Sequence, residues 1–160
     1  MVTISPLAQH RDLVPLLSSW FVEEWPEWYG PGGRGSAVGD LTAFARSQSR
    51  LPVGLIALEN SAPVGVVALK PESLPTHRHL SPWAGAGLVL PSHRGRGIGA
   101  QLLKALVQQA VTLGYPRVYC GTATAVSLLR RSGWSELETT EHEGEAIVIF
   151  SKATAANRWC

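Results

Sequence analysis

Along this chain, segments in which apolar residues recur with the period of a helix alternate with segments that have the pattern of a strand. In residues 8–24 and 97–113 the apolar side chains recur every three or four positions, which is typical of a helix with one face on a core. Asp40 is the expected N-cap of another helix that runs to about Arg50. The expected order is strand 2–5, helices 8–24 and 40–50, strands 53–58, 64–70 and 83–90, helix 97–113, strand 117–121, helix 125–131, and strands 134–141 and 146–151.

The connections between these elements predict how the strands run. The short link Glu59-Asn60-Ser61-Ala62 and the turn at Glu143-Gly144 favour antiparallel hairpins. A long helix separates strands 83–90 and 117–121, so we expect that pair to be parallel. The sequence therefore predicts an α/β (α+β) fold, with a mixed, largely antiparallel sheet of about seven strands and about four helices. We expect a single domain over residues 1–152 and a C-terminal tail over 153–160.

Composition and charge narrow the class of protein. Hydrophobic residues make up 45% of the 160 residues and charged ones 16%, so the chain can bury a core. A net charge of +2 argues against a nucleic-acid partner, and no signal peptide or membrane-spanning apolar run is visible. Cys120 and Cys160 do not suggest a disulfide framework or a metal site. We expect a cytoplasmic protein, monomeric or homodimeric, with no membrane partner and no metal.

The stretch LVLPSHRGRGIGAQLL, residues 88–103, places an apolar run directly before a turn rich in glycine and arginine and then a long helix. The first N–H groups of a helix have no acceptor within it, and about half a positive charge accumulates there. Glycines leave those amides accessible, and Arg94 and Arg96 add positive charge. The turn is therefore predicted to bind a phosphate or diphosphate group.

Two other phosphate-binding motifs fit this stretch less well. Gly95, Gly97 and Ala100 match the dinucleotide pattern G-x-G-x-x-G/A, but the expected acidic residue about 20 positions later is missing from VYCGTA. A nucleoside-triphosphate loop needs G-K-[ST], which is also missing.

The sequence from Arg94 to Gly99 resembles the acyl-coenzyme A signature R/Q-x-x-G-x-G/A of the GNAT N-acetyltransferases, and LLRRSGW, residues 128–134, resembles the second cofactor segment of that family. The resemblance implies a GNAT-like fold and acetyl-CoA as acyl donor, with no metal. It also implies that strand residues before the turn pair with the pantetheine arm, while the turn holds the pyrophosphate. The implied cofactor-binding residues are Gly87, Leu88, Val89, Arg94, Gly95, Arg96, Gly97, Ile98, Gly99, Ala100 and Thr122. For Thr122, an N-cap role for the next helix is an equal alternative.

The implied reaction transfers an acetyl group to a primary amine, of a small molecule or a peptide, by direct attack in a ternary complex. Many members use a tyrosine as general acid, but the matching position here is Leu129. Tyr119, Cys120 or Ser127 could replace it, and no general base is evident from the sequence. A non-catalytic acyl-CoA-binding sensor or interaction module is the alternative function.

The loop EEWPEWYGPGGRG, residues 23–35, is the expected wall of the acceptor site. Glu24, Glu27, Trp28 and Tyr29 would suit a cationic amine, because carboxylates and aromatic faces attract cations. The glycines that follow would let the loop close, and Trp25 would pack against the sheet.

Overall fold

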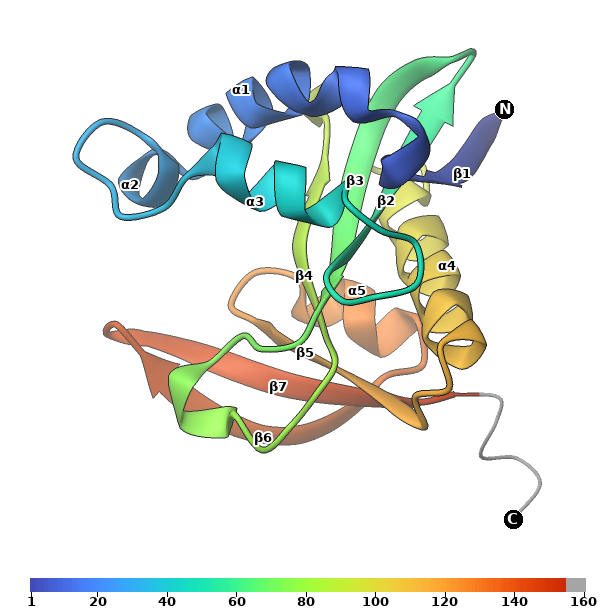
Figure 1. Cartoon of the computed structure of the whole chain (residues 1–160). Coiled ribbons are helices and arrows are strands. Elements are labelled where there is room, and N and C mark those ends of the chain that lie inside the picture. Colours follow the sequence, from blue (N-terminus) through green and yellow to red (C-terminus); the bar gives the residue numbers. More distant parts are fainter. Residues whose placement is uncertain (155–160) are drawn as a thin grey trace.

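The computed structural model describes residues 1–154, and Figure 1 shows them as one sheet with helices on both faces. The seven strands are ordered β1-β2-β3-β4-β5-β7-β6 across the sheet. The strands are β1 (Val2–Pro6), β2 (Val53–Glu59), β3 (Ala62–Lys70), β4 (Trp83–Val89), β5 (Arg117–Thr122), β6 (Ser135–His142) and β7 (Glu145–Ala153). The α-helices are α1 (Val14–Glu24), α2 (Pro26–Tyr29), α3 (Ala37–Phe44), α4 (Ile98–Thr112) and α5 (Val126–Arg131). The expected tail residues 155–160 lie outside the described part.

The strand directions confirm the predicted mixed sheet. Each neighbouring pair is antiparallel except β4 and β5, which run parallel because α4 connects them. The two expected hairpins are present, and their turns place Asn60, Ser61 and Glu143 in the left-handed region of the backbone.

The two faces of the sheet carry separate cores. One core packs α4 and α5 against the sheet around Leu102, Leu106 and Leu129. The other packs α1 and α3 against the opposite face around Phe21 and Leu41. Figure 1 shows α1, α2 and α3 together on one side and α4 apart from them.

Strand β3 contributes side chains to the cores on both faces of the sheet. Successive side chains of a strand point to opposite sides, so Val67 and Leu69 join the core under α4. Val66 and Ala68 join the core under α1 and α3. The same alternation places Lys70, the last residue of β3, on the face of α1 and α3.

The first two helices differ from the prediction. Two 3₁₀ turns, Leu7–Gln9 and Arg11–Leu13, precede α1, which begins only at Val14 with a proline in its first turn. The expected N-cap at Asp40 is wrong, because the Ser36 hydroxyl accepts the Gly39 N–H at 3.0 Å and caps α3 instead. The helix begins at Ala37, so Asp40 lies within its first turn. The helix ends at Phe44 and not near Arg50.

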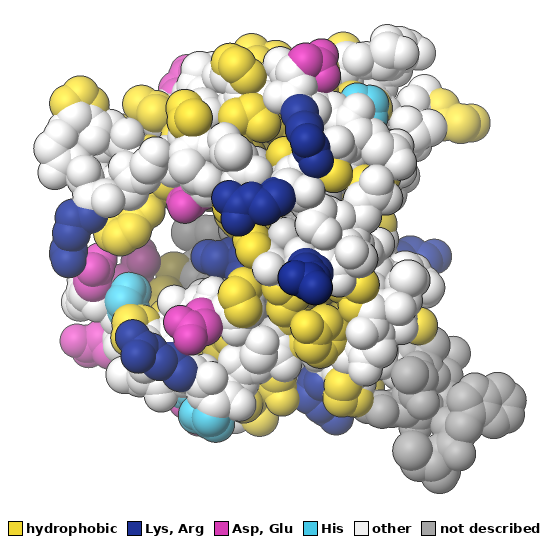
Figure 2. All heavy atoms as spheres, viewed as in Figure 1, with side chains coloured by type: hydrophobic (Ala, Val, Ile, Leu, Met, Phe, Trp, Pro, Cys, Tyr) yellow, Lys and Arg dark blue, Asp and Glu magenta, His cyan; other side chains and the backbone are white. Residues whose placement is uncertain are grey.

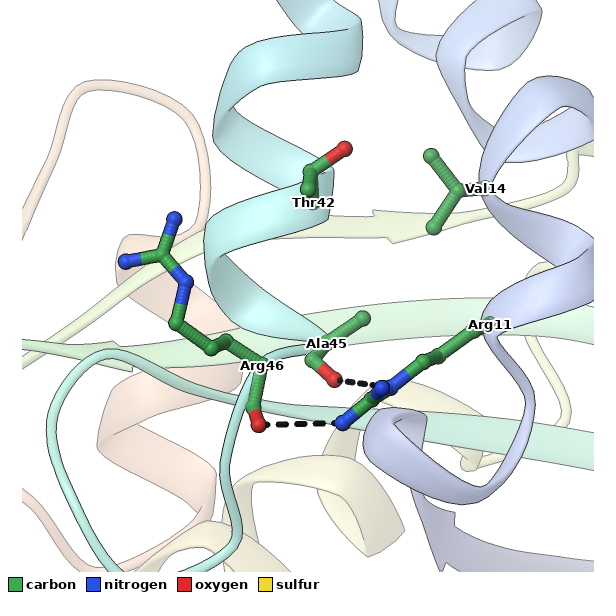
Figure 3. A pocket seen from close by; sticks show the side chains of 5 residues that line it. All are labelled: Arg11, Val14, Thr42, Ala45 and Arg46. Atoms are coloured by element: carbon green, nitrogen blue, oxygen red, sulfur yellow. Dashed lines mark hydrogen bonds between the residues drawn. The ribbon is translucent and has the colours of Figure 1, made fainter.

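Arg11 joins the start of α1 to the end of α3. Its Nε donates to the carbonyl of Ala45 at 3.0 Å and its Nη2 to the carbonyl of Arg46 at 3.2 Å. Figure 3 shows the guanidinium of Arg11 between these carbonyls, at the edge of a hollow of about 440 Å³ that Val14 and Thr42 also line. These carbonyls at the helix end have no partner within α3, so Arg11 closes that end.

None of the helices in residues 1–154 has the length and apolar character needed to cross a membrane.

Candidate active site

Strands β4 and β5 lie next to each other only at their start. Within residues 1–154 the one registered pair between them joins Trp83 to Tyr119, and the Tyr119 N–H donates to the Pro82 carbonyl at 3.0 Å. After this pair the two parallel strands separate, so the later part of β4 presents its backbone on the β5 side. Gly87 and Val89, two of the predicted arm-binding residues, lie on this separated part of β4.

A bulge turns β4 at the same place. The β3–β4 register shifts between Val66 and Ala68, and Ala86 on β4 has a φ of 53°. A residue other than glycine with a positive φ is uncommon and bends the strand locally. The bend explains why β4 leaves β5 before it reaches the glycine turn.

The turn after β4 ends at an exposed helix N-terminus. Gly97 is the N-cap of α4 with a φ of 80°, and no side chain within residues 1–154 caps the helix. The first helical hydrogen bond runs from the Gln101 N–H to the Gly97 carbonyl at 3.0 Å, so the N–H groups of Ile98, Gly99 and Ala100 have no acceptor within α4. A Cβ placed on Gly97 would meet no atom within 4 Å, which shows that this side of the turn faces open space.

The two arginines of the turn are both held by carboxylates. The Arg94 Nη2 donates to Glu24 at 2.9 Å, and its Nε donates to the Val89 carbonyl at 2.9 Å. The Arg96 Nη1 lies 3.7 Å from the carboxylate of Glu59, which also lies 3.3 Å from Nε2 of His93. Arg94 is therefore fixed between α1 and the end of β4.

A groove continues from the turn along α4 to α5 and β7. It measures about 510 Å³, begins at Gly97 and Ala100, and carries three cationic side chains, Lys104, Arg131 and Lys152. The sequence pattern does not group these three residues, because they come from separate elements. Only Lys104 had a local signal, since it lies seven positions after Gly97 and so returns to the same helix face.

On the opposite face, the loop after α2 lies close to the β6–β7 turn. Arg34 in this loop pairs with Glu143 in that turn at 3.6 Å. Figure 2 shows the surface hollowed between these two parts of the molecule. The loop after α2, which borders the hollow, belongs to the side of the sheet that carries α1 and α3 (Figure 1).

The predicted acceptor residues differ in their surroundings. Trp28 is 44% exposed, with the Arg34 guanidinium 6.0 Å from its ring centre, and Glu27 is also exposed. The Tyr29 hydroxyl donates to Asp40 at 2.7 Å, and burial, followed by this contact, raises the pKa of Tyr29. Glu24 lies against Arg94 and so belongs to the turn in this structure.

The loop glycines allow close packing here. A Cβ on Gly35 would come within 2.3 Å of the Trp28 ring nitrogen, and the Gly35 N–H donates to the Trp28 carbonyl at 2.8 Å. Trp25 packs as expected, edge to face against Phe21 with ring centres 5.1 Å apart. The loop is therefore folded back on α2, an arrangement that a larger residue at position 35 would prevent.

Comparison with known proteins settles the family. The family model described as "Acetyltransferase (GNAT) family" matches residues 14–134, more than half of the chain. The chain belongs to the GNAT acetyltransferase family. No curated protein matches the sequence.

Several solved structures share the GNAT fold of this chain. Aminoglycoside 6'-N-acetyltransferase from Enterococcus faecium has a TM-score of 0.74 at 15% identity, with 94% of this chain and 96% of that chain covered. The protein yncA from Salmonella typhimurium, in a structure with acetyl-CoA, has a TM-score of 0.69 at 18% identity, with 99% of both chains covered. Ribosomal-protein-alanine N-acetyltransferase from Brucella melitensis has a TM-score of 0.69 at 18% identity, with 96% and 99% covered.

The position of the usual GNAT tyrosine is part of the core. Leu129 is 1% exposed and packs with Trp134 and Leu106 under α4. A tyrosine there would have to displace well-packed neighbours. Of the alternatives, Ser127 is exposed, Tyr119 packs on Trp83 with ring centres 5.7 Å apart, and burial raises the pKa of the Cys120 thiol to about 12.

Thr122 accepts hydrogen bonds from the backbone just before α5, which agrees in part with the N-cap role considered for it from the sequence. Its hydroxyl oxygen accepts the N–H groups of Thr124 at 3.1 Å and Ala125 at 2.8 Å, just before α5. The hydroxyl proton can still be donated, so a contact of Thr122 with a ligand stays a prediction.

The histidines of the β3–β4 connection lie against the β6 strand. His77 is 8% exposed, and its ring nitrogens lie 2.7 Å from the Thr76 hydroxyl and 2.5 Å from Glu138. His79 stacks on His77 with ring centres 5.8 Å apart. Both ring nitrogens of His77 already have partners, which favours a structural role for this residue.

Proposed function

We propose that this GNAT protein transfers the acetyl group of acetyl-CoA to a primary amine by direct attack on the thioester. The observation that carries the proposal is that the exposed N-terminus of α4 directly follows strand β4, which has separated from β5. A diphosphate fits the first feature and an amide-rich arm fits the second. The two lie in direct succession along the chain, as they do along coenzyme A.

Different residues of this chain would bind the diphosphate, the pantetheine arm and the adenosine end of coenzyme A. The N–H groups of residues 98–100 and the glycine turn would hold the diphosphate, because they are donors at the positive end of a helix. The backbone of Gly87, Leu88 and Val89 would pair with the pantetheine arm. The groove with Lys104, Arg131 and Lys152 would take the adenosine end, whose 3′-phosphate is a further anion.

The acceptor would enter from the other face of the sheet, through the hollow between the loop after α2 and the β6–β7 turn (Figure 2). The amine nitrogen attacks the thioester carbonyl, a C–N bond forms, the C–S bond breaks, and the electron pair leaves on the sulfur. Since a thiol has a pKa of about 8.5, the leaving thiolate needs little help from an acid. The proposed transfer would therefore not need a tyrosine in place of Leu129.

The test combines binding and turnover. Calorimetry with acetyl-CoA measures binding, and thiol release measures acetyl transfer to an aminoglycoside, a peptide with an N-terminal alanine, a free lysine and a polyamine. We expect binding and release with at least one amine, and mass spectrometry then identifies the acetylated product. Binding without release on any amine would support the sensor alternative, and no binding would overturn both.

A further inference from the structure

Lys70 lies on the acceptor side of the sheet, next to the strand that is proposed to hold the thioester. It is the last residue of β3, opposite Trp83 of β4, and shares a face with Val66 and Ala68. Its side chain extends across β4: a Cβ placed on Gly85 would lie 3.1 Å from Cδ and 3.6 Å from Nζ of Lys70. Because Gly85 has no side chain, it leaves the space that the side chain of Lys70 occupies.

The position of Nζ relates directly to the proposed reaction site. Gly85 comes immediately before Ala86, where β4 bulges, and two residues before Gly87, where the proposed arm-binding segment begins. The amine thus lies beside β4 at the point where the strand leaves β5. In the proposed complex the thioester would lie against this part of β4, so an acceptor that enters from the face of α1 and α3 would approach Lys70.

The surroundings of Lys70 weaken its preference for the charged form. Burial lowers the pKa of Lys70, and the negative charge of Asp40 opposes this effect. Asp40 already accepts the hydroxyl of Tyr29, and no carboxylate in the described chain is within ion-pair distance of Nζ. The charged group that acts on Lys70 is Asp40 of α3, which is bound by Tyr29 of α2. On β4 its neighbours are Trp83 and Gly85, and the titratable Tyr119 of β5 packs on Trp83.

We propose that Lys70 is the general base that takes the proton of the acceptor amine as it attacks the thioester. This inference rests on the proposed function. The amine nitrogen forms its bond to the carbonyl carbon, its proton moves to the neutral Nζ of Lys70, and the sulfur leaves with the electron pair of the C–S bond. The resulting ammonium returns its proton to the thiolate or to solvent.

The proposal is tested with Lys70→Met and Lys70→Arg. Methionine removes the amine with little change in length, while arginine keeps the positive charge but holds its proton at all accessible pH values. We expect both variants to lower kcat at pH 7 about 100-fold or more, the range found for removal of a general base, and to leave the Kd of acetyl-CoA within about twofold. Circular dichroism and Tm verify that both variants are folded.

The pH profile separates proton transfer from packing. The rate of the wild type should rise as the pH passes the lowered pKa of Lys70, because only the neutral amine accepts a proton. In Lys70→Arg this limb should disappear. Trimethylamine, which has no N–H to acetylate, should restore part of the activity of a Lys70→Ala variant and leave the wild type unchanged.

Three results would overturn the inference while leaving the proposed function intact. The first is full turnover by Lys70→Arg, which would make the charge the important property. The second is an unchanged pH limb in both variants. The third is an acetyl group found on Lys70 itself after incubation with acetyl-CoA, since a base does not keep the acyl group. A wild type that acetylates no amine would instead reject the proposed function.

Discussion

Cys120 shows how the surroundings of one residue decide its chemistry. From the sequence it is a possible acid, next to Tyr119 in a strand. In the fold it lies on β5 against the core under α4, and burial raises the pKa of its thiol to about 12. A thiol of that kind is neither a nucleophile nor a proton donor to a thiolate of ordinary pKa.

This gives a prediction for a variant Cys160→Ser, in which Cys120 is the only cysteine left. Burial favours the un-ionised thiol of Cys120, so at pH 8 the folded protein should release almost no colour from Ellman's reagent within minutes. In urea the same variant should release one full equivalent. Prompt reaction of the folded protein would show that the thiol is accessible and ionised.

Lys104 makes a second prediction for a single residue. Its ammonium is proposed to neutralise the 3′-phosphate of coenzyme A, so Lys104→Met should weaken the binding of coenzyme A by about fivefold, the equivalent of about 1 kcal/mol. The binding of 3′-dephospho-coenzyme A, which lacks that phosphate, should stay the same. An equal loss for both ligands, measured by calorimetry, would place the adenosine end elsewhere.

At the scale of the element, α3 is stabilised at both ends by residues that the sequence pattern did not single out. Ser36 caps the N-terminus, and Arg11, 34 positions away from Ala45, binds the carbonyls at the C-terminus. A cation at the negative end of a helix is typically worth about 1 kcal/mol. Because Ser36 caps the helix, the Asp40 carboxylate is left to accept the Tyr29 hydroxyl.

We therefore expect Arg11→Met to lower the free energy of unfolding by about 1 kcal/mol, as measured in urea. The matched control is Arg46→Met, because the Arg46 side chain points away from the carbonyls that Arg11 binds (Figure 3). The control should stay within about 0.5 kcal/mol of the wild type. Equal effects of the two substitutions would rule out the capping role of Arg11.

Local elements were the part of the fold that the sequence predicted well. The helix at 98–112 and the hairpin turns at Asn60 and Glu143 depend on neighbours a few positions away, and they were found within one or two residues. The cap of α3 was misassigned because Ser36 and Asp40 are both residues that cap helices well. In the structure Ser36 caps the helix, and Asp40 accepts the Tyr29 hydroxyl instead.

At the scale of the whole molecule, the proposed function places the binding of coenzyme A and of the acceptor on opposite faces of the sheet. The glycine turn and the cationic groove lie with α4, and the acceptor hollow lies with α1 to α3. The turn could be predicted because it is one continuous segment. The groove and the position of Lys70 could not be predicted, because both depend on which elements lie side by side. Lys152 and Arg131 line one groove because β7 and α5 are neighbours in the fold, and the Lys70 side chain lies over Gly85 of the neighbouring strand β4.

The central claim is that the exposed amides at the start of α4 hold the diphosphate of coenzyme A, and calorimetry with acetyl-CoA tests it through two glycines. Gly97 and Gly114 have φ values of 80° and 86° and open space beside them, but only Gly97 lies at the N-terminus of α4. Valine strains the backbone equally at both sites, and at 97 it also covers the amides. We predict that Gly97→Val weakens acetyl-CoA binding more than tenfold while Gly114→Val binds like the wild type, and equal affinities of the two folded variants would contradict the account.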